Sequence, residues 1–322
     1  MTVLGVSAAL IIAYRRYENV DQLIKILDAQ KIEQIYIAID RNSSLKSESL
    51  TDVNRTIEVA KEAKRRMPDR IHIAIHQENV GCSAAVLSAC EWFFENIEFG
   101  LVLEDDCIPS QEFFTYASHC REILRTNSDI WLFCGTQFAP SSASTDSWNL
   151  SKYALIWGWG TSSEKWKQIA SALRTEASVF QRSGIDSAEK QYWSAGADRS
   201  HSGVVDAWDN VLIHRMLSQN KKAILPKFAL VSNIGNDLAA THTFHETNWM
   251  GLETGAFNTP KKEPTDNPEL DAWLKNKFYR ISVRHRITTR ITFLIDLIGL
   301  RRSRSHKLSK RWENARKNLI PL

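Results

Sequence analysis

Three consecutive carboxylates, Glu104-Asp105-Asp106, follow an apolar run at residues 99–103 that is typical of a buried strand. Such a cluster is costly unless a positive group compensates it. Magnesium and manganese are held by one or two carboxylates together with substrate phosphates, and ligands of open α/β sheets bind at the carboxyl ends of strands. The tripeptide therefore predicts a metal–diphosphate site. The alternative is an acidic turn in which Asp106 or Ser110 caps the next helix.

The pattern around this tripeptide alternates between strand and helix. Apolar runs separated by stretches of helical spacing occur at residues 3–13, 34–39, 70–75, 99–103 and 129–134. This order predicts an α/β fold with a mixed, mostly parallel sheet flanked by helices. The second half is less regular: we expect a loop at 138–150, a long polar loop at 174–205, and a helix at 206–219.

Composition indicates a soluble, reduced protein. The chain has 322 residues, of which 43% are hydrophobic, and its five cysteines form no CxxC pair. Scattered cysteines in apolar stretches suit buried thiols of a cytosolic protein. The apolar start lacks a basic region before it, so we expect a strand there instead of a signal peptide. No run reaches the roughly 18 apolar residues that a spanning helix needs.

Two further residues follow predicted strands. Asp40 ends the second strand, and Gly81 follows the third, where it opens a helix and allows close approach of a ligand to the backbone. Each alone is more simply a turn residue. Because three strand ends face one crevice, we expect a nucleotide with its base and ribose near Asp40 and Gly81 and its diphosphate near Asp106.

The residues of segments 78–82 and 103–109 resemble the nucleotide-diphospho-sugar transferases of the GT-A fold, in particular a bacterial surface-polysaccharide group that is called hemolytic-protein-like. The likeness to N-acetylglucosaminyltransferase I is more distant. The resemblance implies a GT-A, Rossmann-like fold. It also implies that Asp106 binds Mn²⁺ (or Mg²⁺) on the diphosphate and that Asp105 faces the donor sugar or ribose, with Glu104 in support.

Other segments extend the resemblance over residues 3–245. Residues 156–161 resemble the family's Trp-Gly-Trp stretch, so Trp159 is expected on the sugar and acceptor side, although one of its two tryptophans is expected in the core. The family's Trp-Asp element corresponds to Trp208-Asp209, which makes Asp209 the expected base, with Asp206 as an alternative base or a helix cap. Residues 230–235 and 240–243 resemble the family's closing motif, which makes His242 a candidate metal ligand or phosphate contact.

The end of the first strand departs from the family pattern. Relatives usually show Thr-Tyr-Asn-Arg where this chain has Ala13-Tyr14-Arg15-Arg16. We expect Tyr14 and Arg15 to contact the nucleotide, and the departure leaves its base open. UDP is the family-level expectation.

The resemblance implies a metal-dependent, inverting glycosyltransferase that moves a sugar from a nucleotide-sugar donor to a glycan or lipid-linked acceptor in cell-surface polysaccharide synthesis. A sugar nucleotidyltransferase can share the sheet, but the Gly-rich triphosphate loop near the N-terminus is absent from this sequence. A non-enzymatic peripheral membrane scaffold with a degenerate transferase fold is the third alternative, and it leaves the acid cluster unexplained.

The C-terminal part differs electrostatically from the rest. From residue 275 onward the charge is +12, whereas the preceding part carries −8. We expect a catalytic domain at 1–255 and a linker with an amphipathic, basic helical region at 256–322. An apolar stretch at 287–300 beside Arg301 and Arg302 suits an anionic inner membrane surface. The alternative is a helix packed on the catalytic domain. No nucleic-acid motif accompanies the charge, so we expect no nucleic-acid partner. We expect a cytoplasmic protein, with a peripheral position on the inner face of the membrane as the alternative.

Overall fold

The structure is a computed structural model that describes residues 5–41, 47–144, 146–175, 184–235, 251–281 and 307–322. Its centre is a nine-stranded sheet in the order β11-β3-β2-β1-β4-β8-β6-β9-β7. The strands are β1 (Ala8–Ala13), β2 (Gln34–Ile39), β3 (Ile71–His76), β4 (Phe99–Glu104), β6 (Ile130–Cys134), β7 (Trp148–Ser151), β8 (Trp159–Ser162), β9 (Lys222–Pro226) and β11 (Leu319–Pro321). A separate two-stranded sheet pairs β5 (Cys107–Pro109) with β10 (Val231–Asn233).

The large sheet is mixed but mostly parallel, as the sequence predicts. Strands β1 to β4 run in one direction, and β6 and β9 share that direction. The strands β7, β8 and β11 oppose them. All of the parallel strands therefore end at the same edge, where the predicted site residues follow β1, β2 and β4.

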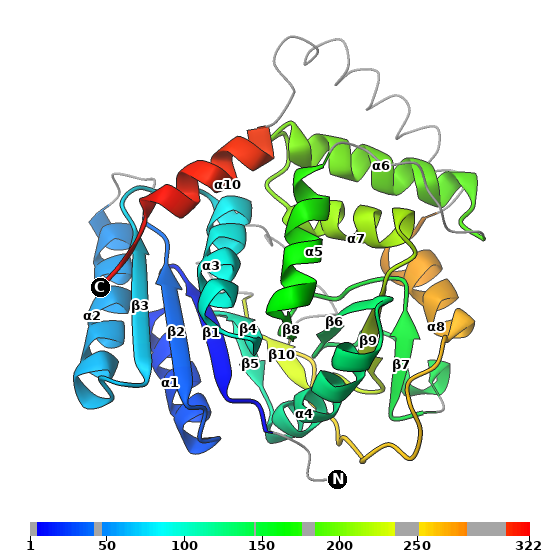
Figure 1. The fold of residues 1–322 in the computed structure, drawn as a ribbon, viewed down its shortest axis with the longest axis horizontal. Helices are drawn as coiled ribbons and strands as arrows, with labels where there is room; N and C mark the ends of the chain where they lie inside the picture. The colour runs from blue at the N-terminus through cyan, green and yellow to red at the C-terminus, as the bar shows by residue number, and fades with distance from the viewer. Residues whose placement is uncertain (1–4, 42–46, 145, 176–183, 236–250, 282–306) are drawn as a thin grey trace.

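Helices cover both faces of the sheet (Figure 1). They are α1 (Tyr17–Ala29), α2 (Ser47–Arg66), α3 (Cys82–Asn96), α4 (Gln111–Thr126), α5 (Ser163–Arg174), α6 (Ser187–His201), α7 (Trp208–Ser218), α8 (Pro268–Trp273) and α10 (Lys307–Asn318), with short turns η1 (Ser141–Ala143) and η2 (Leu274–Phe278). Side chains alternate along β1, so Leu10 and Ile11 belong to two different cores. One core packs under α1, α2 and α4, and the other packs under α3, α5, α7 and α10.

The first half of the chain follows the predicted alternation closely, and β2 has the predicted bounds. Two predictions for the second half are wrong. Residues 187–201, which fall in the expected polar loop, form α6, and 148–151 form the edge strand β7. Helix α6 buries Glu189, which pairs with Lys152 at 2.7 Å. A polar side chain on the inward face weakens the apolar periodicity by which a helix is recognised.

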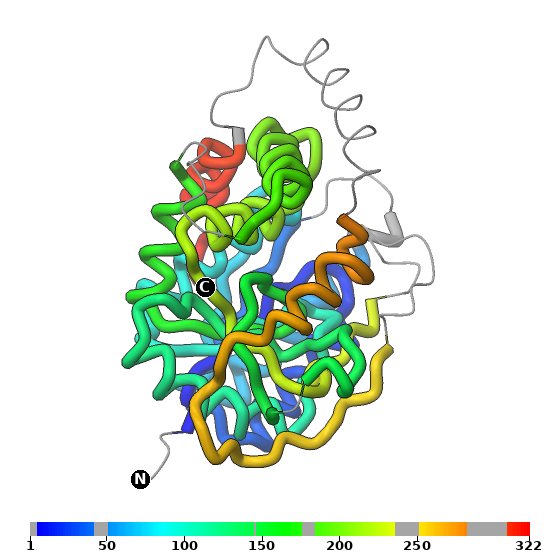
Figure 2. The backbone as a smooth tube through the Cα atoms, turned by 90° about the vertical axis from the view of Figure 1, so that its right-hand side faces the viewer, coloured from blue at the N-terminus to red at the C-terminus, as the bar shows by residue number. Residues whose placement is uncertain are grey.

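The basic C-terminal region contributes to the same fold. Strand β11 pairs antiparallel with β3, and α10 packs on α3 with Trp312 buried against Trp166. Figure 2 shows α10, in red, beside the green α6. Residues 307–321 therefore pack on the remainder of the chain. The apolar stretch at 287–300 lies outside the described residues, so its membrane role and the boundary at 255 stay predictions. In the described ranges no helix has both the length and the apolar character to cross a membrane.

Candidate functional site

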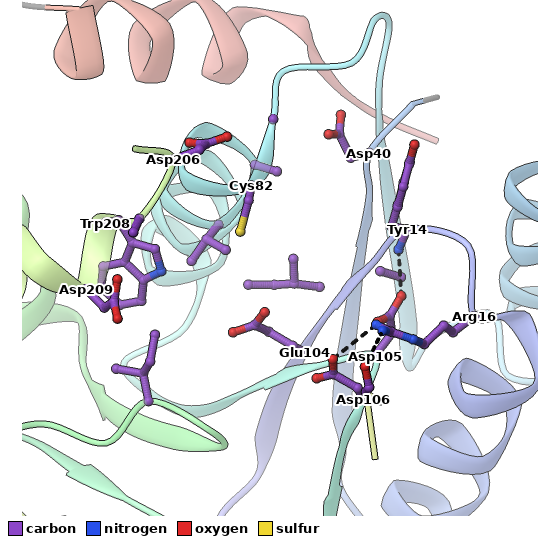
Figure 3. A pocket seen from close by; sticks show the side chains of 18 of the residues that line it. Tyr14, Arg16, Asp40, Cys82, Glu104, Asp105, Asp106, Asp206, Trp208 and Asp209 are labelled. Atoms are coloured by element: carbon purple, nitrogen blue, oxygen red, sulfur yellow. Dashed lines mark hydrogen bonds and ion pairs between the residues drawn. The ribbon is translucent and has the colours of Figure 1, made fainter. Parts of the chain in front are cut away.

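A cavity of about 640 Å³ opens at the carboxyl ends of β1, β2 and β4. Figure 3 shows its walls: the acids after β4 lie beside Tyr14 and Arg16, whereas Trp208 and Asp209 lie across from them. Seven of the nine residues expected to act as base, nucleotide contact or metal ligand line this one cavity, together with Glu104 and Asp206. The seven are Tyr14, Arg15, Asp40, Gly81, Asp105, Asp106 and Asp209.

The register of β1 against β4 builds the acidic wall. Ile12 lies opposite Glu104, so the chain after β4 passes the chain after β1. The backbone N–H of Asp105 donates to the carbonyl of Ile12 at 3.0 Å, and Tyr14 N–H donates back to Asp105 Oδ2 at 2.9 Å. Asp105 is buried, and this exchange fixes its position in the absence of a ligand.

Arg16 is the nearest compensating charge. Its Nη1 lies 2.8 Å from Oδ1 of Asp105 and 3.1 Å from Oδ2 of Asp106, and its side chain is only 14% exposed. A guanidinium that bridges two carboxylates holds both of them in one geometry. Arg16 belongs to the Ala-Tyr-Arg-Arg stretch that departs from the family pattern. Its ion pairs with Asp105 and Asp106 are not predictable from the sequence.

The small sheet brings a distant segment to the acids. Asn233 pairs with Cys107 across β10 and β5, and its Nδ2 donates to Oδ1 of Asp106 at 3.1 Å. The same amide accepts from Gly235 N–H at 2.9 Å. A Cβ at Gly235 would overlap the Asp106 carboxylate, so only glycine allows this approach. Asn233 and Gly235 belong to the closing motif, but no role for either residue is predicted from the sequence.

Burial and the crowding of negative charge raise the pKa values of two acids on this wall. Burial, followed by the charges of Asp106 and Asp105, raises the pKa of Glu104 to about 8. Burial, followed by Asp105, raises the pKa of Asp106 to about 6, although Arg16 acts in the opposite direction. Among the residues that the structure describes, six acidic and two basic side chains line the cavity. The cavity therefore favours a ligand that brings positive charge.

This donor set fits Mn²⁺ or Mg²⁺. Asp106 offers a hard carboxylate ligand, and the surplus of acids that raises its pKa is relieved by a bound cation. Among the described residues, no group of three or more His, Cys, Asp and Glu side chains is placed to hold a metal ion alone. Such cations characteristically take one or two protein carboxylates and complete their shell with phosphates and water. His242, the second predicted ligand, lies outside the described residues.

The loop after β3 forms the wall near Asp40. The Asp40 carboxylate accepts hydrogen bonds from Val80 N–H at 3.2 Å and from Nδ2 of Asn79 at 3.1 Å. Burial raises the pKa of Asp40 to about 6, and the backbone N–H groups of Val80 and its neighbours act against this rise. Asp40 thus fixes the loop from inside the cavity, and Gly81 leaves the backbone accessible there.

Two acids come from the opposite wall, and their surroundings differ. Asp209 lies in the first turn of α7, where the helix dipole favours a carboxylate. Asp206 does not cap this helix, because the N-cap is Ala207 and makes no side-chain bond. Asp206 instead accepts from Ser83 N–H at 3.2 Å. Burial acts to raise its pKa, but hydrogen bonds from Ser83 and Arg311 outweigh it and lower the pKa of Asp206.

The expected place of Trp159 in the ligand site needs correction. Its side chain is 2% exposed in β8 and packs against Trp166 and Trp208, with ring centroids at 6.1 Å and 5.8 Å. Trp157 and Trp208 line the cavity instead. Trp159 contacts Trp208 from within the core, so it supports a residue of the cavity lining.

Comparison with known proteins gives little further guidance. No family model and no curated protein sequence matches the chain. Among solved structures, the chain is similar to UDP-glucose pyrophosphorylase complexed with UDP-glucose, with 10% identity and a TM-score of 0.38, over 69% of this chain and 90% of that chain. A TM-score at this level assigns no function to the chain.

Proposed function

We propose that the protein is a metal-dependent glycosyltransferase that uses a nucleotide-diphospho-sugar. One observation carries the proposal: a cavity of about 640 Å³ at the carboxyl ends of parallel strands has a cluster of carboxylates on one wall and Asp209 on the other. The cavity is large enough for a ligand of drug size, and its position is the usual ligand site of open α/β sheets. The resemblance of the acid motif and the Trp-Asp element to GT-A transferases supports the same assignment.

Asp106 would hold Mn²⁺ or Mg²⁺, with His242 as the predicted second ligand. When bound, the cation supplies Lewis-acid neutralisation of the diphosphate leaving group. Arg16 and Asn233 keep the Asp106 carboxylate in place, since both hydrogen-bond to it. Asp105, held by Tyr14 N–H, would face the donor sugar or ribose.

Asp209 would act as the general base. Its carboxylate accepts the proton of the acceptor hydroxyl while the oxygen of that hydroxyl bonds to the anomeric carbon and the bond from this carbon to the diphosphate breaks. Its place across the cavity from the acids suits in-line displacement with inversion (Figure 3). Asp206 suits this role less well, because Arg311 and Ser83 engage its carboxylate and its pKa is lowered.

The remaining wall would take the nucleoside. Tyr14, Arg15, Asp40 and Gly81 line the same cavity, and UDP is the expected nucleotide. A glycan or lipid-linked acceptor would enter beside Trp157. An anionic membrane surface stays a proposed partner of the basic region, which a vesicle-binding assay with and without anionic lipid would test.

The test of the donor site is calorimetric binding of UDP and GDP, each with and without Mn²⁺, to the wild type and Asp106→Ala. We expect one nucleotide to bind only with Mn²⁺, and about 100-fold weaker binding in the variant, because the charge that holds the cation is lost. Asp105→Asn is the control on the adjacent carboxylate, with a smaller loss. Failure of a folded wild type to bind either nucleotide would contradict the proposal and favour a scaffold.

Product analysis separates the two enzymatic alternatives. A glycosyltransferase converts a nucleotide-sugar and an alcohol into the nucleoside diphosphate and a glycoside. A sugar nucleotidyltransferase converts a nucleotide-sugar and inorganic diphosphate into the nucleoside triphosphate and a sugar 1-phosphate. Incubation of the protein with UDP-sugars and Mn²⁺, with and without added diphosphate, should release UDP and free sugar by slow transfer of the sugar to water, and no UTP. Formation of UTP would replace the proposal with the nucleotidyltransferase.

A further inference from the structure

The C-terminal segment at 307–321 lies directly behind one wall of the cavity. Figure 1 shows α10 crossing above α3 and the chain end reaching the outer edge of β3. Buried Leu308, Trp312 and Ala315 fix the helix against the core. The guanidinium carbon of Arg174 lies 3.7 Å from the ring centroid of Trp312, on the side of α5. The segment is thus docked firmly enough to position residues near the site.

This segment holds the loop after β3 at two points. At the first, the N–H of Gln77 donates to the carbonyl of Asn318 at 3.0 Å, and Nδ2 of Asn318 donates to Glu78 at 2.9 Å. At the second, Nη2 of Arg311 donates to the carbonyl of Val80 at 3.0 Å. Since Asp40 binds the N–H of Val80 from the cavity side, residue 80 is held on both sides.

Arg311 joins this loop to the opposite wall. The same Nη2 lies 3.1 Å from Oδ2 of Asp206, whose Oδ1 accepts from Ser83 N–H at the start of α3. Gly81 lies between them with φ of 81°, and a Cβ there would overlap the Arg311 guanidinium. One side chain therefore ties together the loop, the first turn of α3 and the segment that precedes Asp209.

Arg311 does not line the cavity, although Asn79, Gly81 and Asp206 do. Its influence on a ligand is therefore indirect and has two parts. It fixes the backbone that would contact the ligand, and it neutralises Asp206 in a cavity with an excess of acids. Both parts act on the side of Asp40 and leave Asp106 and Arg16 untouched.

We infer that Arg311 is a positioning residue for the nucleoside half of the bound nucleotide, so that the C-terminal helix is part of the donor site. The inference rests on the proposed function, because it assigns the nucleoside to the wall of Asp40 and Gly81. It predicts that substitution of Arg311 weakens binding of the nucleoside and leaves binding of the metal-bound diphosphate nearly unchanged.

The experiment compares binding of the preferred nucleotide with Mn²⁺ and binding of inorganic diphosphate with Mn²⁺. We expect Arg311→Ala to weaken the nucleotide about tenfold and to leave inorganic diphosphate within about twofold. Arg311→Lys should weaken the nucleotide about threefold, since an ammonium retains the charge but loses the planar fork.

Arg316→Ala is the matched control, because Arg316 lies on the same helix and pairs with Glu95 away from the cavity. It should lose one ion pair of α10 and bind both ligands as the wild type does. Melting temperatures of the variants check folding, and Arg311→Lys carries the test if the alanine variant does not fold. Unchanged nucleotide binding, or equal loss of nucleotide and diphosphate, would overturn the inference alone. A folded wild type that binds neither nucleotide would overturn the proposed function as well.

Discussion

The two walls of the cavity carry acids in different ways. On the strand wall, Asp105 and Asp106 are held by Arg16, by Asn233 and by a backbone N–H before any ligand arrives. On the helix wall, Asp206 is engaged by Arg311 and Ser83, whereas Asp209 stands in the first turn of α7 across from the acid cluster. We propose that the strand wall holds the metal and the diphosphate and that Asp209 on the helix wall acts as the base.

This difference predicts which measured quantity each acid controls. Substitutions on the strand wall should change the affinity for metal and nucleotide. Substitution of Asp209 should change turnover, because a general base acts only in the transition state. The following variants test this division.

The largest effect should come from Asp209→Asn. Loss of the base should lower kcat by about 10³-fold, within the range for general base catalysis, while donor binding stays within about twofold. Steady-state kinetics gives kcat, and calorimetry gives the donor Kd. Asn keeps the shape of the side chain, so a fall in kcat without a fall in affinity isolates the proton transfer.

Asp206→Asn is the contrasting variant on the same wall. Its effect should fall on nucleotide affinity, since the Asp206 carboxylate bonds to Arg311 and Ser83. Normal turnover by Asp209→Asn together with a loss of kcat in Asp206→Asn would assign the base to Asp206. The roles proposed for Asp206 and Asp209 would then be exchanged.

The strand wall was also the more predictable of the two. Apolar runs that end in polar residues mark β1, β2 and β4, and the parallel order then brings Asp40 and Asp106 to one edge. Contacts across the chain were not predictable. Arg311 reaches Asp206 over a separation of 105 residues, and the pairing of Glu189 with Lys152 hides the periodicity of α6. Local patterns report which face of an element is apolar, but they do not report which distant charge compensates a buried acid.

A smaller effect is expected from Arg16→Ala, in the direction of tighter metal binding. The guanidinium now contacts both Asp105 and Asp106, so its removal frees the carboxylate for Mn²⁺ and should raise the affinity for Mn²⁺ alone about tenfold at pH 8. Arg16 also lowers the pKa of Asp106. The gain should therefore shrink towards pH 6, where protons compete more strongly in the variant.

Titration of Mn²⁺ followed by electron paramagnetic resonance measures this affinity directly. Arg15→Ala is the matched control, since it removes the same charge one residue earlier, where the guanidinium lies 5.8 Å from the Tyr14 ring centroid. It should change the affinity for Mn²⁺ by less than about threefold. Weaker Mn²⁺ binding by Arg16→Ala would show that the guanidinium organises the carboxylates for the metal and does not compete with it.

The smallest effect concerns stability and distinguishes charge from packing on the strand wall. The pKa of Glu104 is raised from its ordinary value of 4.5 to about 8 by burial and by the neighbouring acids. Between these two values the native protein binds more protons than the unfolded chain, so its stability falls as pH rises from 4.5 to 8. Glu104→Gln removes this loss, and we expect its melting temperature to exceed that of the wild type by about 2 °C at pH 8.5 but to match it at pH 4.5.

Glu33→Gln is the control at an exposed position and should show no such change with pH. An equal gain at both pH values would assign the effect to packing, whereas a lower melting temperature at pH 8.5 would mean that ionised Glu104 stabilises the strand wall.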